Sequence, residues 1–586
     1  MSSIPEAEVL LAVDVGSINT RASLFDVVDG SYRLIATSRV PSTNIPPFLD
    51  VSEGVRLAME EIKAITGRRF FDENETLIVP TTGYGEGIDA LVGSISGGPP
   101  VRVLLAGLMP DISLASARRL ADSVALDVVA EITPADERLQ EEQIDAIVAA
   151  NPDIILLVGG TDQGARDPLL RLIDIIGLAV SLLPERQRPQ VIFAGNPTMT
   201  TTIVERLAER TNVSMIPNIR PSIENEELGP ARTRLAETLF EIRSTKVGGY
   251  QELLQWSGGE LVPSAEAFGR LIHYLSNIYE PDKGVLGVDL GATQVTVAGG
   301  FGEDLHLTVN PRLGVGRLVE NLLESVSLET IARWLPVNVS LATLRNYIFN
   351  KSIHPQTIPT QMDELHMEYA IARELIRTAL HSARRTWPSR FDPDVSPLLP
   401  PIEPIVATGA TLANTPRPGY AALVLLDALQ PIGITTLVLD PYGLASALGA
   451  MARLLPIATV QLLEAGILEA LGTAISPVGR GRPGRPVLRY QLEPETGGAS
   501  SEGEVRYGQL ISLPLTPDTF GKLTLKPIGR FDVGFGAAGR GGTLRVSGGA
   551  VGVIIDARGR PLSFVQDAEE RREQNLRWLW DMRATG

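Results

Sequence analysis

The order of apolar and polar residues is nearly the same in two widely separated stretches of the chain. In residues 9–28 an apolar run ends at Asp14, a glycine follows two positions later, and apolar and polar residues then alternate. Residues 285–297 repeat this order around Asp289. Alternation with a period of two predicts β-strands, and the glycine predicts a tight turn between them. The pattern therefore predicts two β-hairpins of one design.

Overlaying the two hairpins places an aspartate on an aspartate and a glycine on a glycine. One Asp-x-Gly turn alone is common in β proteins. Two copies with matching flanking strands indicate an internal duplication, with two unrelated hairpins as the alternative. The paired positions are Asp14 with Asp289, Gly16 with Gly291, Ser17 with Ala292 and Asn19 with Gln294.

Residues 101–222 show a different pattern, in which short apolar runs alternate with segments of helical periodicity. Four apolar strands separated by helices are typical of a parallel, doubly wound sheet. The strand ends near Gly159 and Gly195 are glycine-rich, which tight strand-to-helix turns explain most simply, although such sheets also bind ligands there. The predicted strands are 101–107, 127–132, 153–159 and 191–195, and the predicted helices are 115–123, 140–149, 167–183 and 200–210.

The flanks of this insertion contain longer helices and further strands. A helix is expected over 53–66, followed by a strand that ends at 78–80. Helical periodicity covers 317–386, with interruptions near Pro336 and Pro355. Further predicted elements are a strand at 32–39, a strand at 404–407 with a turn at 408–411, and a helix followed by a strand within 421–439.

The composition changes again after about residue 455. Residues 478–486 are rich in Gly, Pro and Arg, which predicts a linker or exposed loop, with phosphate or partner binding as the less expected alternative. A last helix over 567–582 is expected to place Leu576, Leu579 and Trp580 on one face. The strands predicted between them, in a compact β-rich domain clasped by that helix, are 487–492, 505–515, 523–531 and 544–556.

Composition narrows the classes of protein to which the chain can belong. Its 586 residues are too many for one hydrophobic core, and 44% hydrophobic with 21% charged residues is typical of a globular protein. The net charge of −17 disfavours non-specific binding to nucleic acid or anionic membranes. The absence of cysteine excludes disulfides, thiolate catalysis and Cys-ligated metal centres.

The sequence also predicts a cytoplasmic protein. The first eight residues are short and acidic and lack the basic start and apolar core of a signal peptide. The longest apolar run, 421–439, is interrupted by Asp427 and Pro431, so a buried helix and strand are expected there and not a membrane span.

The two hairpins contain the groups that a nucleoside triphosphate requires. Backbone N–H groups bind its phosphates, and carboxylates hold Mg²⁺, usually through water. Glycine in each turn lets the backbone approach the phosphates. If the hairpins face each other across a cleft, Asp14 and Asp289 are the metal-binding and catalytic carboxylates. The candidates for nucleotide contact are Gly16, Ser17, Asn19, Thr20, Gly291, Ala292, Thr293 and Gln294, with Gly409 and Ala410 against adenine or ribose.

This order of motifs resembles the superfamily of actin, sugar kinases and heat-shock chaperone ATPases. The resemblance covers 9–95 and 263–455, and it implies an adenosine motif at 406–412 and connecting helices from 263 onward and over 440–450. The implied fold class is α/β, with duplicated actin-like ATPase (ribonuclease H-like) halves, an inserted doubly wound α/β domain and a C-terminal β-rich domain. The expected boundaries are 1–95 and 251–280 for the first half, 96–250 for the insertion, 281–455 for the second half and 456–586 for the C-terminal domain.

A closer resemblance within that superfamily rests on the motifs at 82–85, 103–111, 152–162, 194–196, 218–221 and 553–561. In these motifs the chain resembles most the glutamate mutase accessory proteins, the L component encoded beside cobalamin-dependent mutases. The resemblance implies ATP and Mg²⁺ as cofactors, cobalamin-dependent mutase subunits as partners, and ATP-driven maintenance of an adenosylcobalamin enzyme. All five histidines lie outside the insertion, so binding to the mutase is expected and not to cobalamin itself.

The resemblance leaves the rate of hydrolysis open. Chaperone ATPases place a glutamate just before the first connecting helix, and here that position is Val262. Glu266 is then the candidate for orienting the attacking water, and slow Mg²⁺-dependent hydrolysis, or binding with little hydrolysis, is expected.

Three other functions are compatible with parts of the same pattern. A small-molecule kinase would need a carboxylate base beside its substrate, and no substrate motif is recognisable. An activator of radical dehydratases shares the turn at 82–85 but requires cysteine ligands, which the chain lacks. A nucleotide-dependent filament or scaffold protein of the actin class remains a third alternative, and the pattern leaves the oligomeric state open.

Overall fold

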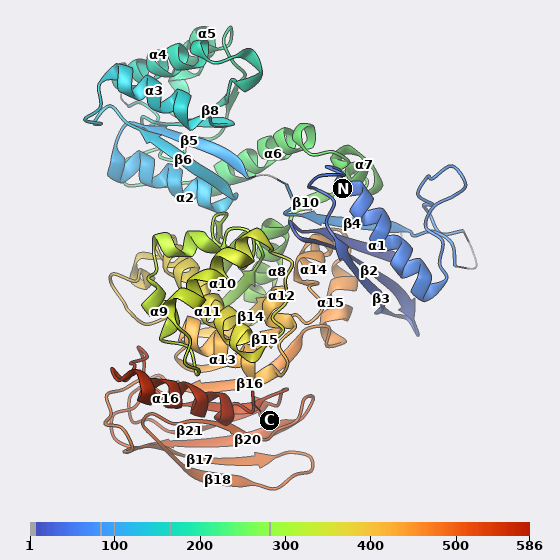
Figure 1. Cartoon of the computed structure of the whole chain (residues 1–586), viewed down its shortest axis with the longest axis vertical. Coiled ribbons are helices and arrows are strands. Elements are labelled where there is room, and N and C mark those ends of the chain that lie inside the picture. Colours follow the sequence, from blue (N-terminus) through green and yellow to red (C-terminus); the bar gives the residue numbers. More distant parts are fainter. Residues whose placement is uncertain (1–6, 83–84, 99, 165, 280–282, 586) are drawn as a thin grey trace. The chain divides into compact units, whose positions relative to one another are not determined.

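A computed structural model describes residues 7–82, 85–98, 100–164, 166–279 and 283–585 of the chain. It divides into two compact units, of which the smaller comprises Gly98–Tyr250 with Thr308–Pro311. The larger unit comprises the rest (Figure 1). In the described part of the chain, no helix has the length and apolar character needed to cross a membrane.

The first sheet of the larger unit joins an antiparallel meander to two parallel strands. The meander is β3–β2–β1, β4 runs parallel to β1, and β10 runs parallel to β4. Helix α1 (Val51–Thr66) packs against β2 and β3. The strands are β1 (Leu10–Val15), β2 (Asn19–Val28), β3 (Ser31–Pro41), β4 (Ala90–Ile95) and β10 (Leu261–Pro263).

The second sheet begins with the same arrangement. A meander β13–β12–β11 is followed by β14 and β15, both parallel to their inner neighbours. Sheet topology therefore repeats the duplication that the two hairpins predict. The strands are β11 (Gly284–Leu290), β12 (Val295–Phe301), β13 (Asp304–Asn310), β14 (Ile402–Thr408) and β15 (Gly433–Leu439).

Helices cover the second sheet, and the predicted interruptions near the two prolines are present. Four helical segments occupy 317–386, and the chain leaves helical structure between them at both prolines. They are a 3₁₀ helix (Val319–Glu324), α9 (Leu328–Ala332), α10 (Leu341–Ile353) and α11 (Met362–Arg384), and they are followed later by α12 (Ala410–Ala413) and α13 (Pro418–Leu429).

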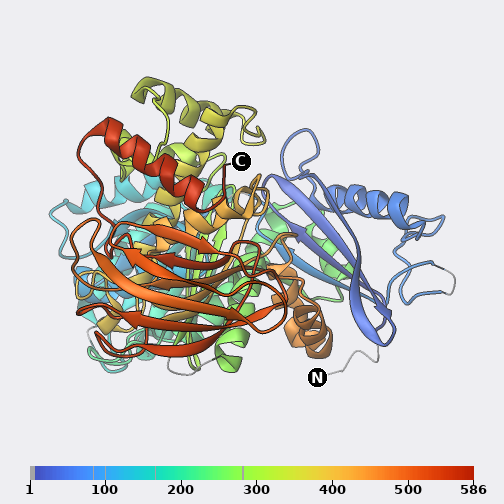
Figure 2. The same ribbon diagram turned by 90° about the horizontal axis from the view of Figure 1, so that it is seen from below.

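The second sheet continues into the C-terminal part of the chain. Strand β16 pairs antiparallel with β15, β22 pairs parallel with β16, and β19 forms the edge. A four-stranded sheet, β18–β17–β20–β21, packs on this extension through one core that includes Ile475, Val553, Leu488 and Leu523 (Figure 2). A shared sheet, and not a linker, therefore joins the predicted second half to the predicted C-terminal domain. The strands are β16 (Glu469–Ser476), β17 (Pro486–Pro494), β18 (Ser501–Arg506), β19 (Leu510–Leu513), β20 (Phe520–Pro527), β21 (Gly542–Ser547) and β22 (Gly552–Asp556).

The smaller unit is the doubly wound sheet that the sequence predicts. Its five strands are all parallel, in the order β6–β5–β7–β8–β9, with α3, α4 and α5 on one face and α2 and α6 on the other (Figure 1). The four strands and four helices predicted for 101–222 are confirmed to within a few residues, whereas β9 and α6 were not predicted. The elements are β5 (Val101–Gly107), α2 (Ala115–Ser123), β6 (Leu126–Ile132), α3 (Gln140–Ala150), β7 (Ile154–Gly159), α4 (Asp167–Leu182), β8 (Gln190–Gly195), α5 (Thr200–Leu207), β9 (Val213–Met215) and α6 (Leu228–Lys246).

The strand predicted to end at 78–80 is wrong. Only isolated bridges, such as that between Phe71 and Leu77, occur in the described residues of this loop, and Pro80 has no N–H to donate to a ladder. The parallel neighbour of β1 is β4 instead, whose buried residues extend to Ile95.

Two long strands predicted near the C-terminus are each two strands in different sheets. Residues 505–515 contain the end of β18 and β19, and residues 544–556 contain most of β21 and β22. The chain passes from one sheet to the other at turns around Gly508 and Gly552, which adopt positive φ angles of 94° and 89°. A pattern of alternation does not reveal that a strand changes sheets.

The apolar face predicted for the last helix is also wrong. In α16 (Ala568–Asp581) the buried residues are Asn575, Trp578 and Leu579, whereas Leu576 and Trp580 are 41% and 62% exposed. The ring of Trp578 lies 4.6 Å from the guanidinium carbon of Arg558, which provides a cation–π contact. The buried face of α16 is therefore the one that carries Trp578 and not the one that the apolar pattern suggests.

Arg558 belongs to a buried chain of ion pairs that ties the C-terminal segment to the second sheet's helices. Asp427 of α13 accepts from Arg373 of α11 and from Arg558, each at 2.7 Å. Asp556 of β22 accepts from Arg558 at 2.8 Å and from Arg560 at 2.6 Å. Burial alone would raise the pKa of Asp556, but the two arginines hold it below its usual range. Removing one member of such a buried pair costs about 3–5 kcal/mol, so this network fixes the position of the C-terminal strands.

Two helices of small residues cross at close range next to the first sheet. They are α8 (Ser264–Ile278) and α14 (Ala445–Leu454), which correspond to the connecting helices that the resemblance implies. A β-carbon at Gly449 would lie 1.7 Å from the carbonyl oxygen of Ala267, so only glycine permits this crossing. The hydroxyl of Ser446 also donates to the carbonyl of Ser264 at 3.2 Å. The crossing fixes the start of α8 relative to both sheets of the larger unit.

Candidate functional site

The turns of the two hairpins have the same backbone geometry. The N–H of Gly16 donates to the carbonyl of Asn19 at 3.0 Å, and the N–H of Gly291 donates to the carbonyl of Gln294 at 3.0 Å. A β-carbon at either glycine would lie 2.7 Å from that carbonyl oxygen. Both turns therefore require glycine at this position. Asn19 and Gln294 close the turns with their backbone carbonyls.

The register of the strands places an aspartate at the same distance from each turn. Asp14 of β1 pairs with Arg21 of β2, and Asp289 of β11 pairs with Thr296 of β12. In both hairpins the aspartate lies two residues before the glycine of the turn. The repeated sequence pattern thus corresponds to a repeated arrangement of carboxylate and turn.

Residues outside the first turn donate hydrogen bonds to its carbonyl groups. Ser42, which follows β3, donates its hydroxyl to the Gly16 carbonyl at 2.7 Å and its N–H to the Ile18 carbonyl at 2.9 Å. The carbonyl of Val15 accepts from the N–H of Gly97 at 2.9 Å. These bonds hold the turn in one conformation without using its own N–H groups.

The second turn is held in a similar way by a neighbouring loop. The carbonyl of Gly291 accepts from the N–H of Val315 at 3.1 Å, and the carbonyl of Ala292 accepts from the N–H of Gly316 at 2.8 Å. A β-carbon at Gly314 would lie 2.5 Å from the Ala292 carbonyl oxygen. Glycines of this loop therefore allow its close approach to the turn.

The N–H groups at the tips of both turns remain available. In the described residues, the amides of Ser17, Ile18, Ala292 and Thr293 donate to no backbone or side-chain acceptor. Successive backbone N–H groups in a turn form a site for anions such as phosphate. The carbonyls are occupied and the amides are open, as binding of a phosphate group requires.

The two turns meet. The hydroxyl of Thr293 donates to the hydroxyl of Ser17 at 3.1 Å, although the residues are 276 positions apart in the chain. The structure thus brings together the two turns that the sequence pairs, and a ligand that engages both sets of open amides would replace this bond.

Two serines that the sequence analysis missed bind the first aspartate. The carboxylate oxygen Oδ1 of Asp14 accepts from the Ser94 hydroxyl at 2.6 Å and from the Ser264 hydroxyl at 2.9 Å. Ser94 belongs to β4, and Ser264 begins α8 beside the predicted motif position Val262. The serine at the start of that helix was the only local signal that could have indicated this contact.

The second aspartate lies in an electrostatically unfavourable place. Burial raises the pKa of the Asp289 carboxyl to about 7, and the nearby Asp14 and Asp440 carboxylates add to the rise. The Arg21 guanidinium opposes the rise without cancelling it. Repulsion between like charges has this effect on neighbouring carboxylates, so Asp14 and Asp440 both contribute to the electrostatic environment of Asp289.

Arg21 is a third residue that the sequence analysis did not include among the candidate site residues. A β-carbon at Gly443, whose φ is 71°, would lie 2.1 Å from a terminal nitrogen of the Arg21 guanidinium. The side chain of the first hairpin therefore reaches the loop after β15. Asp440 of that loop is fully buried and accepts from the Thr408 hydroxyl at 2.9 Å and the Ala445 N–H at 2.7 Å. Asp440 thus shapes the loop, whereas Arg21 is a cation beside the two aspartates.

The turn proposed to contact adenosine packs directly on the second hairpin. Gly409 has a φ of 115°, and a β-carbon there would lie 2.3 Å from the carbonyl oxygen of Leu290. The next residue, Ala410, begins α12 and is partly exposed. The sequence therefore predicted correctly that the turn at 408–411 follows β14, and the structure places it beside Gly291.

Thr20 and Glu266 make other side-chain contacts than those that the sequence predicts. Thr20 is fully buried and its hydroxyl lies 3.0 Å from that of Ser42, so its side chain does not line the exposed face of the turn. Glu266 is 39% exposed and pairs with Arg270 of its own helix at 2.7 Å, whereas Ser264 binds Asp14. In the predicted motif at 82–85, the two middle residues, 83 and 84, lie outside the described residues.

A metal ion at this site would need ligands from a bound nucleotide. In the described part of the chain, no group of three or more His, Asp or Glu side chains is placed to hold an ion. Magnesium at nucleotide sites is commonly held by one or two carboxylates together with phosphate oxygens and water. Asp14 and Asp289 fit the protein's share of such a shell.

The glycines at the strand ends of the smaller unit are explained by packing. A β-carbon at Gly195 would lie 2.2 Å from the carbonyl oxygen of Gly159, and one at Gly159 would lie 2.7 Å from the Leu108 side chain. Asn196 and Asn218 hydrogen-bond to neighbouring loop groups, at Thr198 and Asp162 among others. Close packing of the strand-to-helix turns at the ends of β7 and β8 thus accounts for the glycines at these two strand ends.

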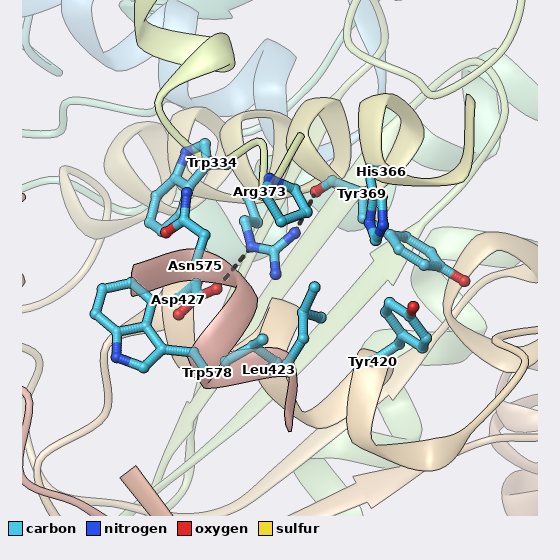
Figure 3. A pocket seen from close by; sticks show the side chains of 11 residues that line it. Trp334, His366, Tyr369, Arg373, Tyr420, Leu423, Asp427, Asn575 and Trp578 are labelled. Atoms are coloured by element: carbon cyan, nitrogen blue, oxygen red, sulfur yellow. Dashed lines mark hydrogen bonds and ion pairs between the residues drawn. The ribbon is translucent and has the colours of Figure 1, made fainter. Parts of the chain in front are cut away.

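A small pocket lies elsewhere in the larger unit, between α11, α13 and α16 (Figure 3). Aromatic rings surround the Arg373–Asp427 pair, and the buried Tyr420 hydroxyl has no hydrogen-bond partner in the described residues. Burial and the neighbouring Arg373 lower the pKa of His366 to about 4. The pocket has room for about one water molecule, so it is not a nucleotide site.

Comparison with known proteins identifies a sequence family. A family model described as "MutL protein" matches residues 10–467, which is most of the chain. The curated Protein MutL of Clostridium tetanomorphum is 21% identical over 404 residues, which cover 63% of this chain and 84% of that protein.

Solved structures of several nucleotide-associated proteins are distantly similar. A nucleotide-free acetone carboxylase shows 13% identity and a TM-score of 0.32, over 85% of this chain and 81% of that one. A glycerol dehydratase reactivase shows 12% identity and a TM-score of 0.28, over 76% and 99%. TM-scores this low do not establish a shared fold, so the fold rests on the sheet topology described above.

The raised pKa of Asp289 predicts a dependence of stability on pH. Between about pH 4 and 7 the folded protein keeps a proton on Asp289 that the unfolded chain has lost, so this group's contribution to stability falls as pH rises through that window. The side chain of the Asp289→Asn variant cannot ionise, so the variant lacks this loss of stability. In EDTA and without nucleotide, the thermal unfolding midpoint of the variant minus that of the natural protein should therefore increase from pH 4 to pH 8.

The exposed Asp304→Asn variant is the matched control for this measurement and should follow the natural protein at every pH. A difference between Asp289→Asn and the natural protein that stays constant with pH would show that Asp289 lies in an ordinary environment.

Proposed function

We propose that this chain, which belongs to the MutL protein family, the glutamate mutase L family, binds ATP with Mg²⁺ between its two hairpin turns. We propose further that it uses the nucleotide to maintain an adenosylcobalamin-dependent mutase. The observation that carries the first part is the meeting of two turns with identical geometry, Ser17 against Thr293, each with its carbonyls bound and its tip amides open.

The arrangement is suited to a polyphosphate chain. One phosphate group would occupy the open amides of Ser17 and Ile18, and another those of Ala292 and Thr293, in place of the hydroxyl contact between the turns. Arg21 is placed to neutralise phosphate charge from the side of β2. The small Gly409–Ala410 turn beside Leu290 would accept the nucleoside.

The carboxylates are suited to a divalent cation. Asp14 and Asp289 repel each other in the absence of a cation, and this repulsion helps to keep the Asp289 carboxyl protonated near neutral pH. A magnesium ion carried by the nucleotide would replace that proton and supply charge neutralisation for the phosphates. Ser94 and Ser264 would hold Asp14 in position for it.

Hydrolysis, if it occurs, is expected to be slow. The only acid proposed to orient water is Glu266, and its carboxylate is bound to Arg270. A general base must reach the proton that it removes, so Glu266 would first have to leave this pair. The proposal is therefore a nucleotide-gated accessory protein and not a fast kinase.

The proposed partner follows from the family. The resemblance to the L component of glutamate mutase systems implies a cobalamin-dependent mutase, and the maintenance role would be exchange of damaged cofactor on that enzyme. Opening and closing of the α8–α14 crossing is the proposed link between nucleotide and partner, because Gly449 and Ala267 contact each other there.

Removing either carboxylate should weaken nucleotide binding only when magnesium is present. Asp14→Asn and Asp289→Asn should each raise the dissociation constant of Mg²⁺·ATP by about tenfold or more, since each removes a negative charge next to the cation. Isothermal titration calorimetry with Mg²⁺ and with EDTA measures the difference.

Glu266→Gln is the matched control for these variants because it removes a carboxylate from the same unit. It should bind Mg²⁺·ATP like the natural protein, and a loss of turnover with unchanged binding would assign Glu266 to the attacking water. Unchanged Mg²⁺·ATP affinity in both aspartate variants would place the nucleotide elsewhere.

The partner is tested with a cobalamin-dependent glutamate mutase that has been inactivated by turnover. Addition of this protein, Mg²⁺·ATP and fresh adenosylcobalamin should restore mutase activity, and the Asp14→Asn variant should not. Pull-down of the mutase in the presence of ATP and then of ADP measures the interaction. Absence of both recovery and binding, with intact ATP affinity, would reject the accessory role and leave the nucleotide site standing.

A further inference from the structure

Six arginines gather at one end of the C-terminal sheets, and we refer to them together as the arginine surface. Three of them lie on the loop that precedes β17, Arg506 is the last residue of β18, next to the loop that follows it, and two lie on the loop that connects β20 to β21. These loops contain one aspartate and no glutamate or lysine, in a chain whose net charge is −17. The arginine surface consists of Arg480, Arg482, Arg485, Arg506, Arg530 and Arg540.

The first two loops are hydrogen-bonded to each other. The N–H of Tyr507 donates to the carbonyl of Arg485 at 2.8 Å, and the N–H of Gly484 donates to the carbonyl of Tyr507 at 3.0 Å. The guanidinium of Arg506 also donates to the carbonyl of Gly484 at 3.2 Å. The arginines of these two loops are therefore neighbours in space as well as in composition.

The third loop joins the same end of the sheets. Val478 and Asp532 exchange two backbone hydrogen bonds of 2.8 Å, and the ring of Phe531 packs on Gly479. The rings of Phe531 and Tyr507 are 6.3 Å apart, which links all three loops. Backbone hydrogen bonds and the packing of the Phe531 and Tyr507 rings hold the loops together, and within the described residues Arg506 is the one arginine of the six whose side chain donates a hydrogen bond between them.

The arginine side chains of this surface make few ion pairs or hydrogen bonds with the described part of the chain. All six are exposed. Arg506 lies 3.6 Å from Glu504, and in the described residues the other five have neither an ion pair nor a side-chain hydrogen bond. The carboxylate of Asp532 is occupied by the N–H of Gly534 at 2.8 Å. Like charges placed side by side destabilise a folded protein, so this cluster calls for an external partner.

We propose that the arginine surface docks an acidic, carboxylate-rich segment of a partner protein. Arginine binds carboxylates through paired hydrogen bonds, and Pro483 and Pro486 restrict the loop that carries half of the arginines. A long nucleic acid would extend from this surface over a chain with a large negative excess, which repels it. A short acidic segment meets only the local positive field, whose range is about 8 Å at physiological salt.

The test uses the full chain and a fluorescein-labelled peptide of about ten glutamates, followed by anisotropy at about 50 mM and 300 mM salt. The natural protein should bind the peptide, and salt should weaken binding. A variant with Arg480→Ala, Arg482→Ala and Arg485→Ala should bind about tenfold more weakly at low salt. Arg530→Ala with Arg540→Ala should also weaken binding, because the third loop belongs to the same surface.

The matched control removes three exposed arginines from three different helical segments, through Arg171→Ala, Arg186→Ala and Arg345→Ala. It changes net charge equally and should retain peptide affinity. Absence of peptide binding, equal loss in the control, or an unaffected third-loop variant would overturn the proposal. Tighter binding of single-stranded DNA of equal charge, lost in the same variants, would overturn it in favour of a nucleic acid. Unchanged unfolding midpoints in all variants show that the fold is intact.

Discussion

The central constraint on the structure is the electrostatic interaction of two carboxylates, one at the end of each hairpin's first strand. Asp14 and Asp289 end equivalent strands of two sheets, and burial with mutual repulsion raises the pKa of Asp289 to about 7. A folded chain tolerates such a pair when the surrounding structure leaves it no other place. Here the strand registers and the two glycine turns fix the backbone that carries both side chains.

The rest of the larger unit serves to hold these groups in place. Ser42 and the loop with Gly316 bind the carbonyls of the turns, and Ser264 connects Asp14 to the helix crossing at Gly449. Ser264 therefore connects Asp14 to the crossing of α8 and α14, whose opening and closing is the proposed link to the nucleotide. The buried ion pairs of Asp427 with Arg373 and Arg558 connect the helices of the second sheet to the C-terminal strands.

Features that depend on neighbouring residues could be predicted from the sequence. Contacts between side chains from distant parts of the chain could not. Both hairpins and the doubly wound unit were predicted because strand alternation and turn glycines are encoded by neighbouring residues. Ser94, Ser264 and Arg21 were missed because each reaches the site from a different element. Thr20 was predicted to contact phosphate from its position in the motif, but the pleat of β2 points it inward against Ser42. The same limit explains α16, whose buried face depends on Arg558 beneath Trp578.

The most direct measurement is a crystal structure of the protein with Mg²⁺ and a non-hydrolysable ATP analogue. The account predicts phosphate groups at the tip amides of Ser17 and Thr293, the Ser17–Thr293 hydroxyl contact broken, and the metal ion beside Asp14 and Asp289. Nucleotide bound at any other place, with that contact intact, would contradict it.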